Sequence, residues 1–179
     1  MKIFLLTHER ELHRTTNTGS LALGDSNNIV ERVLWERVNP SKDLTRLIEN
    51  NEAVLLYSKG KLSSGRSSDI PSKLTPEIWS ATSPTTSPTT SPVIIEDYEN
   101  IIIIDSTWQE ARKIFNHSHY LQNAPQVTLK TTNDSLYKLR ANQPKGGLCT
   151  IECIIEVLRL KGQDKVASEL SLKFDLFNG

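Results

Sequence analysis

Apolar runs of strand length alternate with polar segments along this chain of 179 residues. Five runs are rich in β-branched and aliphatic residues and predict β-strands at residues 2–7, 29–35, 53–57, 101–104 and 126–129. Between the second and third runs, residues 41–50 have apolar side chains at helical spacing behind Ser41, a residue type that favours helix N-termini. A strand, a helix and a strand in succession predict a parallel sheet.

The second half of the chain adds a central strand and further helices. Residues 101–104 are all isoleucine, which is typical of a strand covered on both faces, and they lead directly into Asp105. Helical spacing follows at residues 107–115, 148–160 and 162–176. We therefore predict a single α/β domain over residues 1–179, with a central, mostly parallel sheet and a polar loop at residues 9–19.

Residues 59–92 differ in composition from the rest and contain a Ser-Pro-Thr-Thr repeat. Proline at this frequency excludes a helix, and the polar residues cannot offset the entropy lost on ordering. We expect a mobile surface loop. A tolerated insertion is the favoured interpretation, and contact with RNA through Lys59, Lys61 and Arg66 is the other.

Charge and cysteine content limit the classes of function. Lys plus Arg and Asp plus Glu each number 21, so any nucleic-acid site must be a local patch. No apolar run approaches the roughly 20 residues needed to cross a bilayer, and the apolar start is too short for a signal peptide, so we expect a cytoplasmic protein. Cys149 and Cys153, four residues apart in a helical segment, predict buried thiols and neither a disulfide nor a metal site.

Asp105, Ser106, Thr107 and Trp108 follow the predicted central strand, at the edge where open α/β sheets bind ligands. A carboxylate there can accept a proton or hold an ammonium group, hydroxyls can bind a polar edge, and an indole can stack on a flat ring. The alternative is structural: Asp105 or Ser106 caps the next helix and Trp108 packs in the core.

The sequence DSTWQEARKIF at residues 105–115 resembles the D-x-T-W signature of the DTW-domain family and its Q-x-A-R-K continuation. Three more blocks resemble family motifs in the same order: THERELHRTTNTGSLAL, AVLLYS and SLYKLRANQPKGGLCTIECIIEVLR. Together they cover roughly residues 5–160. The resemblance implies a fold related to the SPOUT methyltransferases, with a trefoil knot in the C-terminal part that holds the cofactor.

The resemblance also implies transfer of the 3-amino-3-carboxypropyl group of S-adenosylmethionine to a uridine of tRNA, leaving methylthioadenosine. It favours a monomer over a dimer. We assign Asp105 as the catalytic residue, either as the base for the uridine imide or as an anchor for the cofactor's ammonium group. The expected cofactor-binding residues are Thr18, Gly19, Leu56, Ser106, Thr107, Trp108, Leu129, Gly147, Leu148 and Thr150.

Basic residues close to these motifs are the expected RNA contacts: Arg14, Arg112, Lys113, Lys138, Arg140 and Lys145. His8 is given only a structural role or a role in supporting residues that contact the ligand. Many family members begin with a cysteine cluster that resembles a zinc site; this chain starts beyond it, so no metal is expected. Two other functions remain open: the same transfer to ribosomal RNA or another acceptor, and a non-catalytic module that binds the cofactor or RNA.

Overall fold

The computed structural model of the chain describes residues 1–24, 28–57, 92–129, 135–138 and 147–179. The chain divides into two units, one made of Met1–Ser58 with Val93–Gly179 and the other of Lys59–Pro92. The fold described below is that of the first unit. The predicted mobile loop, apart from Pro92, lies outside the described residues.

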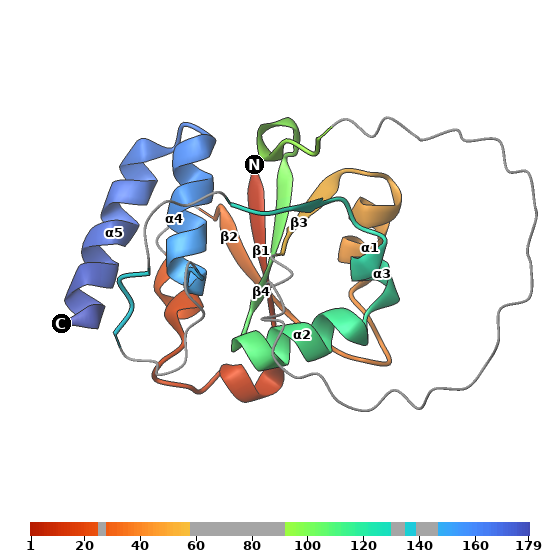
Figure 1. Cartoon of the computed structure of the whole chain (residues 1–179), viewed down its shortest axis with the longest axis horizontal. Helices are drawn as coiled ribbons and strands as arrows, with labels where there is room; N and C mark the ends of the chain where they lie inside the picture. Colours follow the sequence, from red (N-terminus) through yellow and green to blue (C-terminus); the bar gives the residue numbers. More distant parts are fainter. Residues whose placement is uncertain (25–27, 58–91, 130–134, 139–146) are drawn as a thin grey trace, which may run out of the picture. The chain divides into compact units, whose positions relative to one another are not determined.

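A parallel sheet forms the centre of the first unit (Figure 1). Its strands among the described residues are β1 (Lys2–Thr7), β2 (Val30–Leu34), β3 (Ala53–Leu56), β4 (Asn100–Asp105) and β5 (Gln126–Val127). They lie in the order β2-β1-β4-β3-β5, and every pair is parallel. The predicted α/β class and all five predicted strands are confirmed. However, β2 and β3 are not neighbours, because β1 and β4 lie between them.

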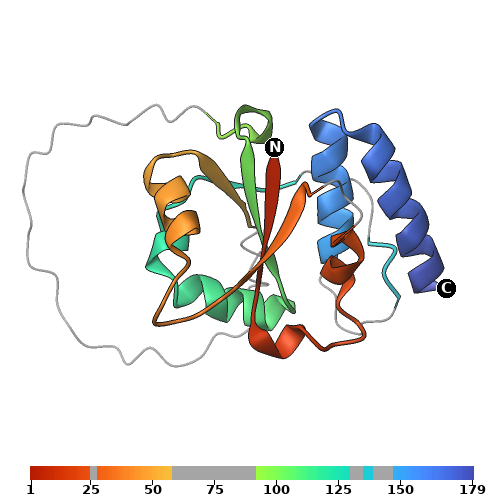
Figure 2. The same cartoon turned by 180° about the vertical axis from the view of Figure 1, so that it is seen from behind.

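Helices cover both faces of the sheet (Figures 1 and 2). Alternate side chains of β1 and β4 pack into two separate apolar clusters. What we call the α4 face packs against η2 (Thr18–Ala22), α4 (Thr150–Leu160) and α5 (Asp164–Asn178). The opposite α2 face packs against α1 (Lys42–Glu49), α2 (Trp108–Asn116) and α3 (His119–Gln122). The isoleucine strand β4 is thus covered on both sides, as its sequence predicts.

Local signals set where the helices begin. Ser41 caps α1, as predicted, with its hydroxyl accepting from the Leu44 N–H at 3.4 Å. Thr107 caps α2 by accepting from the Glu110 N–H at 3.3 Å. Helix α4 begins two residues later than predicted because Cys149 is its N-cap residue. Helix α3 and the 3-10 turns η1 (Glu9–Glu11), η2 and η3 (Ile95–Asp97) were not predicted.

The relation to SPOUT enzymes and the trefoil knot stay predictions. Residues 130–134 and 139–146, which belong to the connection from β5 to α4, lie outside the described residues. Within the described ranges, none of the helices has the length and apolar character required to span a membrane.

Candidate active site

Asp105 ends β4 with its carboxyl group turned toward the α4 face. The residue is 2% exposed. Its Oδ2 accepts hydrogen bonds from Asn17 Nδ2 at 2.9 Å, Thr7 Oγ1 at 3.2 Å and Arg32 Nη2 at 3.4 Å. The strand register explains the grouping, since Thr7 pairs with Asp105 and Leu5 pairs with Arg32. Asp105 therefore does not cap α2, since the N-cap residue is Thr107.

Asn17 connects Asp105 to the Thr-Thr-Asn-Thr-Gly block. While its Nδ2 donates to Asp105, its Oδ1 accepts from the Ser20 N–H at 3.0 Å and so caps η2. Gly19 then lies directly on the carboxyl group. A Cβ placed on Gly19 would be 2.6 Å from Asp105 Oδ1, closer than real Cβ atoms come to other heavy atoms. Only glycine fits at position 19 without displacing the carboxylate.

The same block also contacts the last family-like block. Tyr137 donates its hydroxyl hydrogen to the Thr16 carbonyl at 2.8 Å, and the Ile151 N–H in the first turn of α4 donates to Thr18 Oγ1 at 3.3 Å. These residues are 121 and 133 positions apart in the sequence. The structure therefore brings together three segments that the sequence analysis had linked only by their resemblance to motifs of one family.

A four-residue segment, residues 135–138, is fixed beside this group by two side chains that the sequence had not singled out. Glu152 in the first turn of α4 accepts from Ser135 Oγ and from the main-chain N–H groups of Leu136, at 2.7 Å, and Cys149, at 2.8 Å. Asn178 near the end of α5 accepts from the Lys138 N–H at 2.9 Å and donates to the Leu136 carbonyl at 2.7 Å.

Aromatic side chains come shortly after the carboxyl ends of β3 and β4. Trp108 begins α2 and is 37% exposed, so it does not pack in the core. Tyr57, directly after β3, stacks on Phe115 with ring centroids 4.3 Å apart. Burial raises the pKa of Tyr57, and the nearby charge of Arg112 partly offsets this rise. Tyr57 belongs to the quoted block AVLLYS and packs against the apolar cluster of the α2 face.

His8 comes directly after β1, as Tyr57 comes directly after β3. Its Nδ1 accepts from the Arg10 N–H at 3.1 Å, and its ring centroid is 5.4 Å from that of Trp35. Its Nε2 lies 4.0 Å from Glu110 Oε1. The role given to His8 stays a prediction.

The other residues predicted to bind the cofactor differ in how far they are exposed to solvent. Thr18, Gly19 and Gly147 are buried. Five more are partly exposed at or near the carboxyl edge: Leu56, Ser106, Thr107, Leu148 and Thr150; Leu129 after β5 is also partly exposed. Hydrogen bonds between described residues join Thr18 to α4, whereas Ser106 donates only to the neighbouring Thr107 carbonyl.

Four of the predicted RNA contacts are exposed: Arg14, Arg112, Lys113 and Lys138. Arg14 pairs with Glu11 at 3.3 Å, and Lys113 pairs with Glu110 at 3.7 Å. Arg140 and Lys145 lie outside the described residues.

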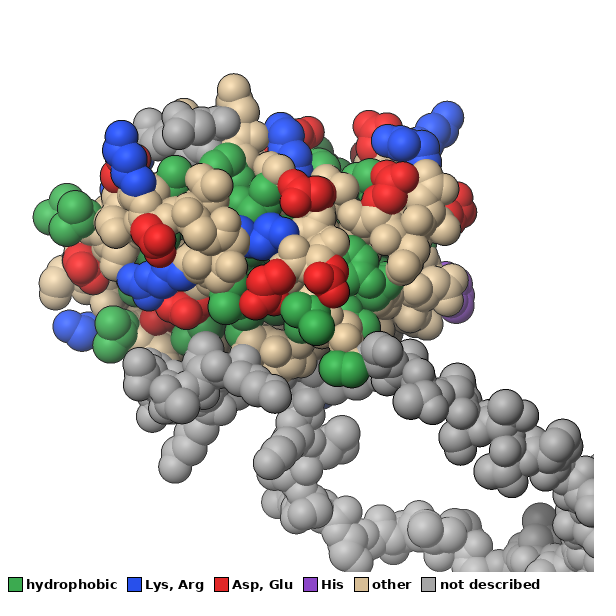
Figure 3. All heavy atoms as spheres, turned by 90° about the horizontal axis from the view of Figure 1, so that it is seen from above, with side chains coloured by type: hydrophobic (Ala, Val, Ile, Leu, Met, Phe, Trp, Pro, Cys, Tyr) green, Lys and Arg blue, Asp and Glu red, His purple; other side chains and the backbone are tan. Residues whose placement is uncertain are grey.

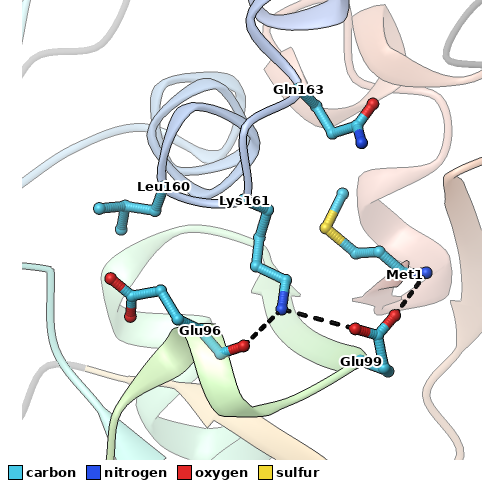
Figure 4. Close-up of a pocket in the computed structure, with 6 residues that line it drawn as sticks. All are labelled: Met1, Glu96, Glu99, Leu160, Lys161 and Gln163. Carbon is cyan, nitrogen blue, oxygen red and sulfur yellow. Dashed lines mark hydrogen bonds and ion pairs between the residues drawn. The ribbon is translucent and has the colours of Figure 1, made fainter.

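A hollow of about 390 Å³ lies at the opposite, amino end of the sheet (Figure 4). Its charges are paired internally: the Met1 ammonium contacts Glu99 at 2.8 Å, and Lys161 Nζ donates to the Glu96 and Tyr98 carbonyls. Figure 3, a view from this end, shows acidic and basic side chains interspersed. Among the described residues that line this hollow the acidic side chains are exposed, unlike the buried carboxylate of Asp105. In the described part of the chain, no three His, Cys, Asp or Glu side chains are grouped to hold a metal ion.

The chain is similar to known proteins. The family model of the DTW domain matches residues 1–179. A curated relative, tRNA-uridine aminocarboxypropyltransferase 2 of Macaca fascicularis, is 34% identical over 73 residues, which are 41% of this chain and 24% of that protein. The match thus spans about a quarter of the relative's length. No solved structure matches the chain.

Proposed function

Because the chain belongs to the DTW-domain family, we propose that it transfers the 3-amino-3-carboxypropyl group of S-adenosylmethionine to a uridine of tRNA. The observation that carries the proposal is the convergence of three motif segments at one sheet edge, around the carboxylate of Asp105. The name of the curated relative supports tRNA as the acceptor.

The residues at this edge fit the chemistry of the cofactor. Asp105 Oδ2 is taken by three donors, while Oδ1 accepts no hydrogen bond from the described residues and can accept from an ammonium group. The half-buried Leu56 and Leu148 offer an apolar wall for a purine ring, and Trp108 offers an exposed indole for stacking. The remaining proposed cofactor contacts are Thr18, Gly19, Ser106, Thr107, Leu129, Gly147 and Thr150.

The bound cofactor supplies a sulfonium group, so a C–N bond to uridine forms as the C–S bond breaks, and methylthioadenosine and the imide proton leave. The protein must then orient the reactants and take up one proton. Asp105 is suited to either task through Oδ1. As a base it receives the imide proton; as an anchor it holds the α-ammonium group and leaves the proton to solvent. Both roles require the carboxylate to keep its present orientation.

Exposed cations around the edge are proposed to bind the RNA. Arg14 lies in the segment after β1, Arg112 on α2, and Lys138 on the segment held by Glu152 and Asn178. In a chain without net charge, such a local set supplies the salt-dependent attraction that phosphates need. Arg140 and Lys145 belong to the same proposal on sequence grounds.

The test is to incubate the purified chain with S-adenosylmethionine and bulk tRNA, digest the RNA and weigh the nucleosides by mass spectrometry. We expect a uridine heavier by one aminocarboxypropyl group, with Asp105→Asn as the inactive control. Ribosomal RNA in a parallel reaction tests the other acceptor class. A methylated nucleoside, or no modified nucleoside with either RNA, would contradict the proposal.

A further inference from the structure

We propose that Arg32 is a positioning residue, which fixes the carboxylate of Asp105 and the side-chain amide of Asn17 in the orientation that the transfer requires. This inference rests on the proposed function for its kinetic consequence. Its structural consequence, the order of the segment around Asn17, can be measured independently of any activity.

The position of Arg32 in the sheet calls for an explanation. Its side chain lies on the α4 face of β2, the same face on which Val30 packs into the apolar cluster, and it is only 18% exposed. An apolar residue would fill this space without the cost of removing a charge from water. The adjacent Asp105 side chain, 3% exposed, explains why a cation is present at this position. The positive charge of Arg32 and the negative charge of Asp105 attract one another where both are largely buried.

Arg32 contacts both partners with one nitrogen. Nη2 lies 3.4 Å from Asp105 Oδ2 and 3.4 Å from Asn17 Oδ1. These contacts select one orientation of the Asn17 amide. In the flipped orientation Nδ2 would face the guanidinium and Oδ1 would face the carboxylate, which places two donors together and two acceptors together. The Ser20 N–H donates to Asn17 Oδ1 at 3.0 Å and Asn17 Nδ2 donates to the Glu11 carbonyl at 3.3 Å, so both favour the same orientation, to which the Arg32 charge adds.

The guanidinium group of Arg32 leaves one of its donors without a hydrogen bond to a described residue. Arg32 Nε is the one buried side-chain nitrogen or oxygen in the described ranges that has no hydrogen-bond partner. Buried donors are normally satisfied, and exceptions concentrate where function sets the geometry. An unsatisfied Nε next to two weak contacts indicates a residue held in place for its charge and direction.

The experiment compares Arg32→Met, which removes the charge, Arg32→Lys, which keeps it, and Lys2→Met as a control. Lys2 is also a strand cation, but it pairs with Glu31 on the surface and its side chain is 42% exposed. For each variant we would measure kcat and KM with tRNA and S-adenosylmethionine, and hydrogen exchange of the Ser20 amide. The Ser20 N–H reports directly on Asn17 because it donates to Asn17 Oδ1.

We expect Arg32→Met to lower kcat by about 100-fold with little change in KM for tRNA, as a small misplacement of a reacting group does. Arg32→Lys should restore part of this loss, and Lys2→Met should behave as the unaltered protein. Exchange at Ser20 should become about 10-fold faster in Arg32→Met. If Arg32→Met does not fold, Arg32→Lys decides, with kcat still reduced.

Full kcat or unchanged Ser20 exchange in folded Arg32→Met would overturn the inference, as would full kcat in Arg32→Lys if that is the only variant that folds. Failure of the unaltered protein to modify tRNA is a different result, because it contradicts the proposed function. In that case the exchange measurement alone still decides whether Arg32 orders the segment around Asn17.

Discussion

Gly19 and Asp105 are in direct contact across 86 positions of the sequence, so that a Cβ on Gly19 would lie 2.6 Å from Oδ1 and 2.8 Å from Oδ2. Position 19 in one family-like block therefore accommodates only a glycine, because the aspartate of another block occupies the space where a larger side chain would lie. Two motifs that are separate in the sequence act as one structural unit.

Replacement of Gly19 by alanine should therefore damage the site. The methyl group must displace the Asp105 carboxylate or the main chain of η2, so we expect kcat to fall by about 100-fold. Overpacking of this kind costs about 1–3 kcal/mol of unfolding free energy. Urea unfolding and the nucleoside assay measure the two effects.

Gly162→Ala is the matched control for this variant. Gly162 has φ of +71°, and a Cβ placed on it would meet no heavy atom of the described residues within 4 Å beyond its own chain neighbours. Alanine there should cost about 1 kcal/mol through its backbone conformation alone and leave kcat unchanged. An equal loss of kcat in both glycine variants would mean that Gly19 acts through general stability.

Asp105→Asn should abolish transfer, because the amide can neither take up a proton nor attract an ammonium group. Titration calorimetry with S-adenosylmethionine distinguishes the two proposed roles. If Asp105 anchors the ammonium group, affinity should fall by about 10-fold or more, the size expected for a charge-assisted hydrogen bond. Affinity close to that of the unaltered protein would exclude the anchor and favour the base.

Glu152→Ala should destabilise the fold much more than Glu156→Ala on the same helix. The first change leaves Ser135 Oγ and the N–H groups of Leu136 and Cys149 without their acceptor, at a cost of about 3 kcal/mol. Glu156 makes a surface ion pair with Arg159, and its loss should cost well under 1 kcal/mol. Equal unfolding free energies for the two variants would contradict the role given to Glu152.

The two thiols should resist alkylation in the folded protein at pH 8 and react fully after unfolding in urea. Burial raises the pKa of Cys149 to about 12, and it raises the pKa of Cys153 as well. Unfolded thiols ionise near 9, so the folded state binds more protons above that pH. The thiol contribution to stability is complete below pH 9 and declines as pH rises toward 12.

Removal of both thiols tests this dependence. A Cys149→Ala, Cys153→Ala variant should lose stability less steeply between pH 9 and pH 10.5 than the unaltered chain, as measured by urea unfolding. Parallel slopes for the two proteins would show that other groups cause the alkaline loss.

Local signals were sufficient to predict the strands and the longer helices of the fold. The isoleucine run at residues 101–104 identified the central strand, and Ser41 identified the start of a helix. Helix α3 has four residues, too few for a helical pattern to appear in the sequence. The order of the strands was not predictable, because it depends on pairings between distant segments such as β1 with β4.

The residues of the candidate site were also predictable only in part. Resemblance selected Asp105, Thr18 and Gly19, and the structure brings them together. Arg32 and Asn178 gave no signal, because each owes its importance to partners at least 15 positions away that only folding brings near. An edge strand and the last turn of a helix are also places where a single arginine or asparagine is ordinary.

The parallel arrangement of the sheet has a consequence for synthesis of the protein. The closest partner of β1 in sequence is β2, with Ile3 opposite Val30, and its other neighbour begins only at Asn100. Until the ribosome has made that isoleucine strand, the fully buried side chains of β1, such as Leu5, have an incomplete set of neighbours. One edge of β1 can pair with β2 early, whereas the other edge stays unpaired until the strand that begins at Asn100 has been made.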